Sequence, residues 1–151
     1  MVYVQIAIGA ALAILVHELG HAFFQTIFRI PVHLIEWGSG PRLFKLGKFE
    51  MRLIPFSGGI QPNGVRLANA KWKGVLIALG GLIAQWFMVV VSAVIVVQLN
   101  LLRFEWIENI IVVFVVCAFL SFFNLIPYRG TDGYHLFRLF YKKTRKAAVN
   151  E

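Results

Sequence analysis

Three long apolar stretches constrain the fold of this chain more than any other feature of its sequence. They run from about residue 2 to 28, from 75 to 99 and from 107 to 126, and a helix that crosses a bilayer needs about 20 mostly apolar residues. Hydrophobic residues make up 59% of the 151 residues and charged residues only 15%, whereas a soluble domain carries about 25% charged residues. We therefore expect an α-helical multi-pass membrane protein with three transmembrane helices, forming a single domain over residues 1–151.

Basic residues lie mainly on one side of these spans. Eight Lys and Arg residues lie between the first and second spans, six follow the third, and one lies between the second and third. Loops rich in Lys and Arg stay in the cytoplasm, so we predict an N-terminus outside and a C-terminus in the cytoplasm, with a bacterial cell membrane expected from the small size. The net charge of +8 then reflects membrane topology, and nucleic acid is not an expected partner. Labelling of a cysteine near Lys45 only from outside the cell would contradict this orientation.

The segment between the first two spans, about residues 32–62, has the pattern of a β-hairpin. Residues 48–53 alternate polar and apolar side chains, with Glu50 on the polar face, as in a half-buried strand. Gly47 is placed to reverse the chain, and we expect the hairpin to associate with the membrane. Residues 131–146 carry basic side chains on one face and Leu136, Phe137 and Phe140 on the other. That pattern predicts a short C-terminal helix at the membrane interface, near anionic headgroups.

The pentapeptide His17-Glu18-Leu19-Gly20-His21 carries the chemistry of the first span. Histidines four residues apart share one face of a helix, so both imidazoles can bind one metal ion. Glu18 stands beside them and can act on a water molecule as a general base. Charges inside an apolar span cost about 2.5–3.5 kcal/mol each on insertion scales. Three ionisable groups at this spacing therefore favour a metal site over a polar contact between helices.

The third ligand of such a site is not evident from spacing. A catalytic zinc site usually has three protein ligands, but position 27, six residues after His21, is Ile. The glutamates before the third span lie on the opposite side of the membrane, and Glu36 and Glu50 lie in the hairpin. Asp132 is the only aspartate and lies on the cytoplasmic side. It is explained equally well as a metal ligand and as the first residue of the final helix, where the helix dipole favours an acid.

These motifs together resemble the site-2 protease family of intramembrane zinc metalloproteases. The family combines HExxH in one membrane helix with a later Asn, a Pro three residues on, and Asp-Gly at positions eight and nine. Asn124, Pro127 and Asp132-Gly133 follow that order here. Residues 37–41 and 53–59 also resemble the membrane-associated hairpin of the family. The resemblance covers about residues 12–135.

The resemblance implies an intramembrane zinc metalloendopeptidase that acts in regulated intramembrane proteolysis. It implies one Zn²⁺ ion bound by His17, His21 and Asp132, with Glu18 as the catalytic base. The expected partners are the lipid bilayer and a single-pass transmembrane protein or peptide, cleaved in or near its transmembrane helix. An unidentified membrane regulator is left open as a further partner. The expected form is minimal, without a PDZ-like or nucleotide-sensing domain.

Substrate contacts are implied for Asn124, Gly58 and Gly59. Asn124 is equally well explained as a polar cap at the end of the third span. The hairpin, in turn, either offers a strand edge to an extended substrate peptide or only lies in the interface.

The middle span departs from the family pattern. Relatives often carry Gly-Pro-x-x-Asn where this chain reads Gly80-Gly81-Leu82-Ile83-Ala84, so the role of that asparagine is absent or moved to Gln85. Gly74, Ala78, Gly81 and Gln85 share one helix face. The preferred interpretation of this face is close helix packing through small residues.

The main alternative is a non-enzymatic membrane metal-binding protein or carrier that uses the same ligands. Such a protein would not need Glu18 and would show further metal ligands along a path through the membrane. Beyond the candidate ligands the spans offer mainly Gln25, Gln85 and Asn124, which are poor zinc ligands. A catalytically inactive relative is disfavoured because Glu18 is intact. Another membrane zinc protease built on HExxH would typically take its third ligand from a Glu on a different helix.

Overall fold

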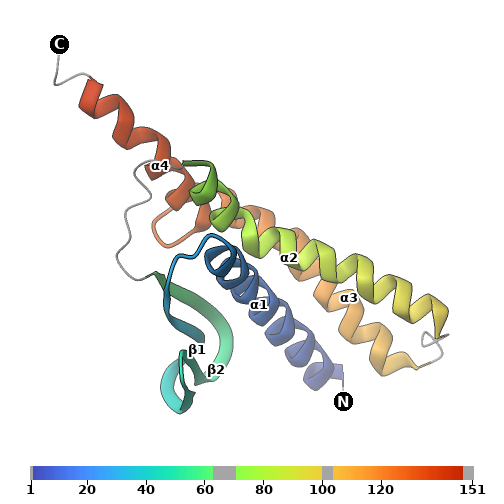
Figure 1. Cartoon of the computed structure of the whole chain (residues 1–151). Coiled ribbons are helices and arrows are strands. Elements are labelled where there is room, and N and C mark those ends of the chain that lie inside the picture. Colours follow the sequence, from blue (N-terminus) through green and yellow to red (C-terminus); the bar gives the residue numbers. More distant parts are fainter. Residues whose placement is uncertain (1, 63–70, 100–103, 148–151) are drawn as a thin grey trace.

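The computed structural model describes residues 2–62, 71–99 and 104–147. The order of elements is helix α1 (Val2–Ile27), strands β1 (Val32–Leu46) and β2 (Phe49–Pro62), helix α2 (Lys71–Gln98), helix α3 (Glu105–Leu120), the 3-10 helix η2 (Ser121–Leu125) and helix α4 (Asp132–Ala147). Figure 1 shows α1, α2 and α3 as a bundle of long helices, with the hairpin beside α1. Helix α4 extends beyond the end of the bundle at which α2 begins (Figure 1).

Within the described residues, three helices are long and apolar enough to cross a membrane. They are Val2–Ile27, Lys71–Gln98 and Glu105–Leu125, the last of which includes η2. The three predicted spans are thus confirmed as helices, with ends shifted by a few residues.

The helices bury small residues and expose large ones. Their buried apolar residues are mainly alanines such as Ala13, Ala78 and Ala118, and none of the large side chains in the described ranges is fully buried. Phe23 and Phe87, in contrast, are 60% and 65% exposed. Small residues between helices and large apolar side chains on the outside are typical of helices that pack in lipid. The packing therefore supports a membrane location.

Helices α1 and α2 approach each other at a pair of glycines. A Cβ atom added at Gly20 would overlap the backbone of Gly80, and one added at Gly80 would lie 2.8 Å from the Gly20 carbonyl oxygen. A side chain at either position would force the two helices apart. Helix α3 is joined to α1 by a hydrogen bond of 2.9 Å from Asn109 Nδ2 to Gln5 Oε1. The close approach at the glycines fixes the position of the HExxH motif of α1 against α2, and the hydrogen bond joins α1 to α3 three turns away from His17.

Strands β1 and β2 form an antiparallel hairpin that turns at Gly47 and Lys48. Gly47 has a φ of +57°, which a residue without Cβ adopts readily, and the predicted hairpin is confirmed. Its strands curl, so that Glu36 lies opposite Gly59 and also opposite Glu50. Glu50 was predicted on the polar face of a half-buried strand; in the structure it is buried and pairs with Arg52 at 2.9 Å. The alternation of polar and apolar residues predicts the strand, but it does not predict the curvature of the hairpin that buries the Glu50 carboxylate.

The chain reverses between η2 and α4. Gly130 has a φ of +95°, and Thr131 caps the following helix. Its Oγ1 donates a hydrogen bond of 2.6 Å to the Ile126 carbonyl and accepts one of 3.3 Å from the Tyr134 N–H, as in an N-cap. The first residue of α4 is therefore Asp132, and the reversal directs it back towards α1. The position of α4 relative to a bilayer surface stays a prediction, and the side chains of the basic residues 142–146 lie outside the described part.

Candidate metal centre

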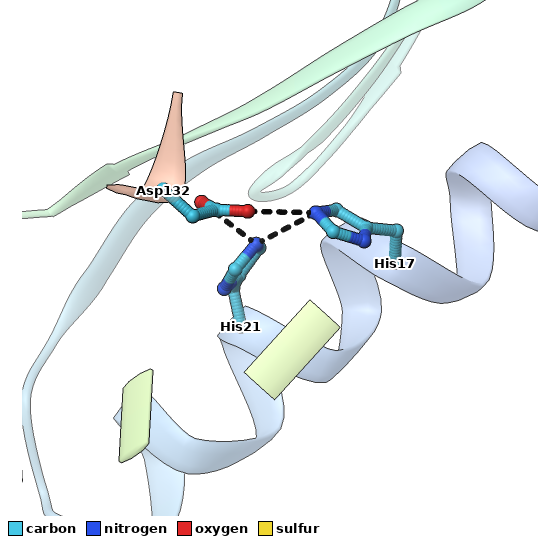
Figure 2. Close-up of side chains that lie close together, drawn as sticks. All are labelled: His17, His21 and Asp132. Carbon is cyan, nitrogen blue, oxygen red and sulfur yellow. Dashed lines mark hydrogen bonds and ion pairs between the residues drawn. The ribbon is translucent and has the colours of Figure 1, made fainter. Parts of the chain in front are cut away.

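Two side chains of α1 and one from the start of α4, more than 100 residues later, meet inside the bundle. His17 Nε2 lies 3.0 Å from Asp132 Oδ2, His21 Nε2 lies 3.3 Å from Asp132 Oδ1, and the two Nε2 atoms lie 3.1 Å apart. Figure 2 shows both rings projecting from successive turns of α1 toward the carboxylate of Asp132. Both histidines are buried and Asp132 is partly buried. One ion at this point would be within reach of all three side chains.

The other nitrogen of each ring has its own hydrogen-bond acceptor on α2. His21 Nδ1 lies 2.6 Å from the Ile77 carbonyl oxygen, and His17 Nδ1 lies 3.2 Å from Gln85 Oε1. Oxygen atoms of this kind can only accept, so each Nδ1 carries a proton and donates it. A neutral imidazole carries one proton, and each Nε2 therefore presents a lone pair to the other Nε2 and to Asp132.

This donor set fits a zinc ion. Two lone pairs and a carboxylate that face one another at about 3 Å repel unless a proton or a metal cation lies between them. Ligands about 2.0–2.2 Å from a tetrahedral zinc lie roughly 3.3–3.5 Å from one another, close to the separations found here. Two imidazoles and one carboxylate also leave the fourth position open, as in catalytic rather than structural zinc sites.

Asp132 reaches this position because of the residue that follows it. Gly133 lies against the Leu125 carbonyl, and a Cβ atom there would overlap that oxygen. The glycine thus lets the first turn of α4 pack on the end of η2, which brings Asp132 to the histidines. The sequence left open whether Asp132 is a metal ligand or the first residue of the final helix. In the structure it begins α4 and also faces the two histidine rings.

The electrostatic environment keeps the Asp132 carboxylate ionised. Burial raises the pKa of this carboxyl, but when the rings also carry a proton on Nε2, their hydrogen bonds and charges lower it more, and the pKa then lies well below its usual range. An ionised carboxylate is the form that binds a metal cation.

Glu18 lies at the edge of the same centre. Its side chain is buried and packs on Gly58 of β2, where a Cβ atom would overlap it. Glu18, His17 and Asp132 line a cleft of about 420 Å³ whose other walls come from β2, α2, α3 and η2. The hairpin therefore contributes one wall of the cleft, directly against Glu18.

The structure separates the residues predicted to contact substrate. Asn124 on η2 and Gly58 on β2 both line the cleft, whereas Gly59 is not among the lining residues. Asn124 is exposed, so its amide is free to meet a bound peptide or water. The substrate roles of all three residues stay predictions.

The two neighbouring glycines of β2 predict different mutational effects. Gly58→Ala is expected to lower the rate of any hydrolysis that depends on Glu18 by roughly 10–100-fold, because the added methyl group displaces Glu18 and a shift of about 1 Å at a reacting group has effects of that order. Gly59→Ala adds a methyl group with no atom within 4 Å, so Glu18 keeps its position. Cleavage kinetics of both variants check this. An equal loss in both would assign the effect to substrate contacts of the two glycines and not to Glu18.

Comparison with known protein sequences identifies the family of this chain. The sequence profile of peptidase family M50 matches residues 5–111, more than half of the chain. The chain belongs to peptidase family M50. This is the site-2 protease family, and the matched part of the M50 chain contains the HExxH motif, the hairpin and α2. It ends before Asp132, so the place of Asp132 in the site follows from the tertiary structure.

One curated relative of this M50 protein comes from Fusobacterium nucleatum and is named "Putative zinc metalloprotease FN1322". The two are 30% identical over 78 residues. The aligned segment covers 49% of this chain and 23% of the relative, so the chain spans about a quarter of that protein. The similarity supports a zinc metalloprotease family, while the activity of the whole relative is not carried over.

Three features of the M50 site on α2 were missed or only partly seen in the sequence. The acceptor for His21 is a backbone carbonyl, for which no residue type is a signal. Gly81 packs on His17, whose ring lies 2.5 Å from the position of a Cβ atom. Gln85 was considered as a replacement for the missing asparagine, and its hydrogen bond to His17 became visible only in the structure. The predicted close packing of this helix face is present, and the site is built into it.

Proposed function

We propose that this M50 protein is an intramembrane zinc metalloprotease that hydrolyses a peptide bond in or near the transmembrane helix of a single-pass substrate. The observation that carries the proposal is the meeting of His17, His21 and Asp132 at a cleft that Glu18 also lines. Metal-assisted hydrolysis requires a general base beside the metal ligands, and Glu18 lies there without belonging to the ligand set.

The residues would divide the chemistry between them. His17, His21 and Asp132 would hold one zinc ion, which when bound supplies Lewis-acid polarisation of a carbonyl group and lowers the pKa of water. Glu18 accepts a proton from the attacking water as the water oxygen bonds to the peptide carbon. It then returns that proton to the departing amine nitrogen as the C–N bond breaks.

The cleft also has features that suit an extended peptide. A transmembrane helix holds its carbonyl groups in its own hydrogen bonds, so a substrate helix must unwind locally before it is cut. Asn124 can hydrogen-bond to the exposed backbone of such a segment, and the part of β2 near Ser57 can pair with it as a strand. In the orientation predicted from the basic loops, water reaches the site from the cytoplasm.

Removal of zinc tests the proposal. The full chain in detergent is incubated with a single-pass model substrate, before and after treatment with a zinc chelator. We expect cleavage in or near the substrate helix that stops on chelation and returns when zinc is added back. Normal zinc binding without cleavage of any single-pass substrate would contradict it and would support the membrane metal-binding or carrier alternative.

A further inference from the structure

We propose that Gln85 is a positioning residue for the metal centre, which holds the His17 ring in the tautomer and orientation that direct Nε2 to the metal. The inference rests on the proposed zinc site, but it does not depend on proteolysis. This role differs from a contact with substrate, because the Gln85 amide meets His17 at Nδ1, the ring nitrogen that does not face Asp132.

The hydrogen bonds of Gln85 define the direction of its amide group. The side chain is only 3% exposed. Its Nε2 donates a hydrogen bond of 2.9 Å to the Ala13 carbonyl of α1, and a carbonyl oxygen can only accept. The amide oxygen must therefore face the other way, toward His17 Nδ1 at 3.2 Å. Ala13 and His17 are one helical turn apart on α1. The same helix therefore holds the Gln85 amide and carries the His17 ring that this amide orients.

The two histidines differ in what holds them. The acceptor for His21 is the backbone carbonyl of Ile77, which no side-chain substitution removes. The acceptor for His17 is a side chain and can be removed. Gly81, midway between Ile77 and Gln85, has no side chain and leaves room for the His17 ring to lie against α2. Positions 77, 81 and 85 thus form one face of α2 that supports the metal centre.

Loss of the acceptor would change the state of His17. Without a partner for the Nδ1 proton, the neutral ring also populates the tautomer with its proton on Nε2, and that proton points at the position of the cation. The ring is also free to rotate about its side-chain bonds. Removal of such a supporting hydrogen bond typically weakens metal binding by 10–100-fold.

Zinc affinity of three variants in detergent, measured by competition with a chromophoric chelator, tests the role of Gln85. We expect Gln85→Leu, which is similar in size but has no acceptor, to bind zinc roughly 10–100-fold more weakly. Gln85→Glu keeps an oxygen acceptor at the same distance along the side chain and is expected to restore at least about tenfold of that loss. Gln85→Met gives the same comparison as the leucine variant if Gln85→Leu does not fold.

The matched control is Gln5→Leu. Gln5 also lies on a membrane helix and makes an interhelical amide hydrogen bond, to Asn109, but it is three turns from His17. Its replacement is expected to leave zinc affinity unchanged. In ¹⁵N-histidine spectra of the zinc-loaded proteins, the Nδ1 proton of His17 should be protected from exchange in the wild type and in Gln85→Glu, and should exchange rapidly in Gln85→Leu.

Two results would overturn the proposal. One is wild-type zinc affinity in folded Gln85→Leu, and the other is a loss of affinity that Gln85→Glu does not reverse, which would assign Gln85 to packing alone. Both are read from zinc binding without substrate. Absence of proteolysis in a protein that shows the expected affinities would contradict the proposed function and leave this inference standing.

Discussion

Glu18→Gln is expected to abolish peptide hydrolysis while leaving the metal centre assembled. The amide is nearly the same size as the carboxylate and keeps the packing on Gly58, but it cannot accept and return a proton. General-base catalysis contributes about 10²–10⁴-fold, so kcat/KM for a single-pass substrate should fall by at least about 100-fold. Zinc content, measured on the same preparation, should equal that of the wild type because Glu18 is not one of the three candidate ligands.

Glu108→Gln is the matched control for this variant. Glu108 lies exposed in the first turn of α3, outside the cleft, and its replacement should leave cleavage unchanged. Undiminished cleavage by a zinc-loaded Glu18→Gln protein would contradict the assigned role of Glu18 as the base. Loss of zinc together with activity would instead show that Glu18 belongs to the ligand set.

Asp132→Ala is expected to remove most of the zinc affinity. Changes beyond the direct ligands cost 10–100-fold in affinity, and loss of a ligand should cost more than about 100-fold. Thermal unfolding offers a second measurement, since zinc at about 100 times its dissociation constant stabilises a folded protein by about 2.7 kcal/mol. The wild type should therefore unfold at a higher temperature when zinc is added, and Asp132→Ala should not respond at the same zinc concentration.

His135→Ala provides the comparison on the same helix. His135 is exposed and lies one turn after Asp132. The variant therefore tests whether zinc binding depends on Asp132 itself or on any potential ligand near the start of α4. Zinc affinity should stay at the wild-type level in this variant. If His135→Ala lost zinc and Asp132→Ala retained it, the ligand set drawn from the structure would be wrong.

Local patterns accounted for much of the architecture. Each transmembrane helix was predictable because a run of about 20 apolar residues in a chain this poor in charge has few other stable forms. The pairing of His17 with His21 was predictable because helix geometry places residues four apart on one face. The hairpin followed from alternation and from Gly47, where the chain needs a positive φ.

Contacts between distant elements were less accessible. The meeting of Asp132 with the two histidines depends on how the chain turns back after η2, and that turn rests on the Thr131 cap and on the fit of Gly133 against the Leu125 carbonyl. The burial of Glu50 depended on the curl of the hairpin. Neither can be read from periodicity, because each depends on the separation of residues in space and not along the chain.

The amino-acid sequence by itself determined the membrane-spanning helices, the hairpin and the two histidines with Glu18, since all of these follow from hydrophobicity and from the geometry of a single element. The motif resemblance already implied Asp132 as the third ligand, but only the tertiary structure showed how it reaches the histidines. Only the tertiary structure, too, decided that Gly58 packs on Glu18, and that Gln85 and the Ile77 carbonyl hold the two rings. The physical reason is that a metal centre requires several donors within a few ångströms. That proximity is produced by helix packing at Gly20, Gly80 and Gly81 and by the reversal before α4, not by any one segment of the chain.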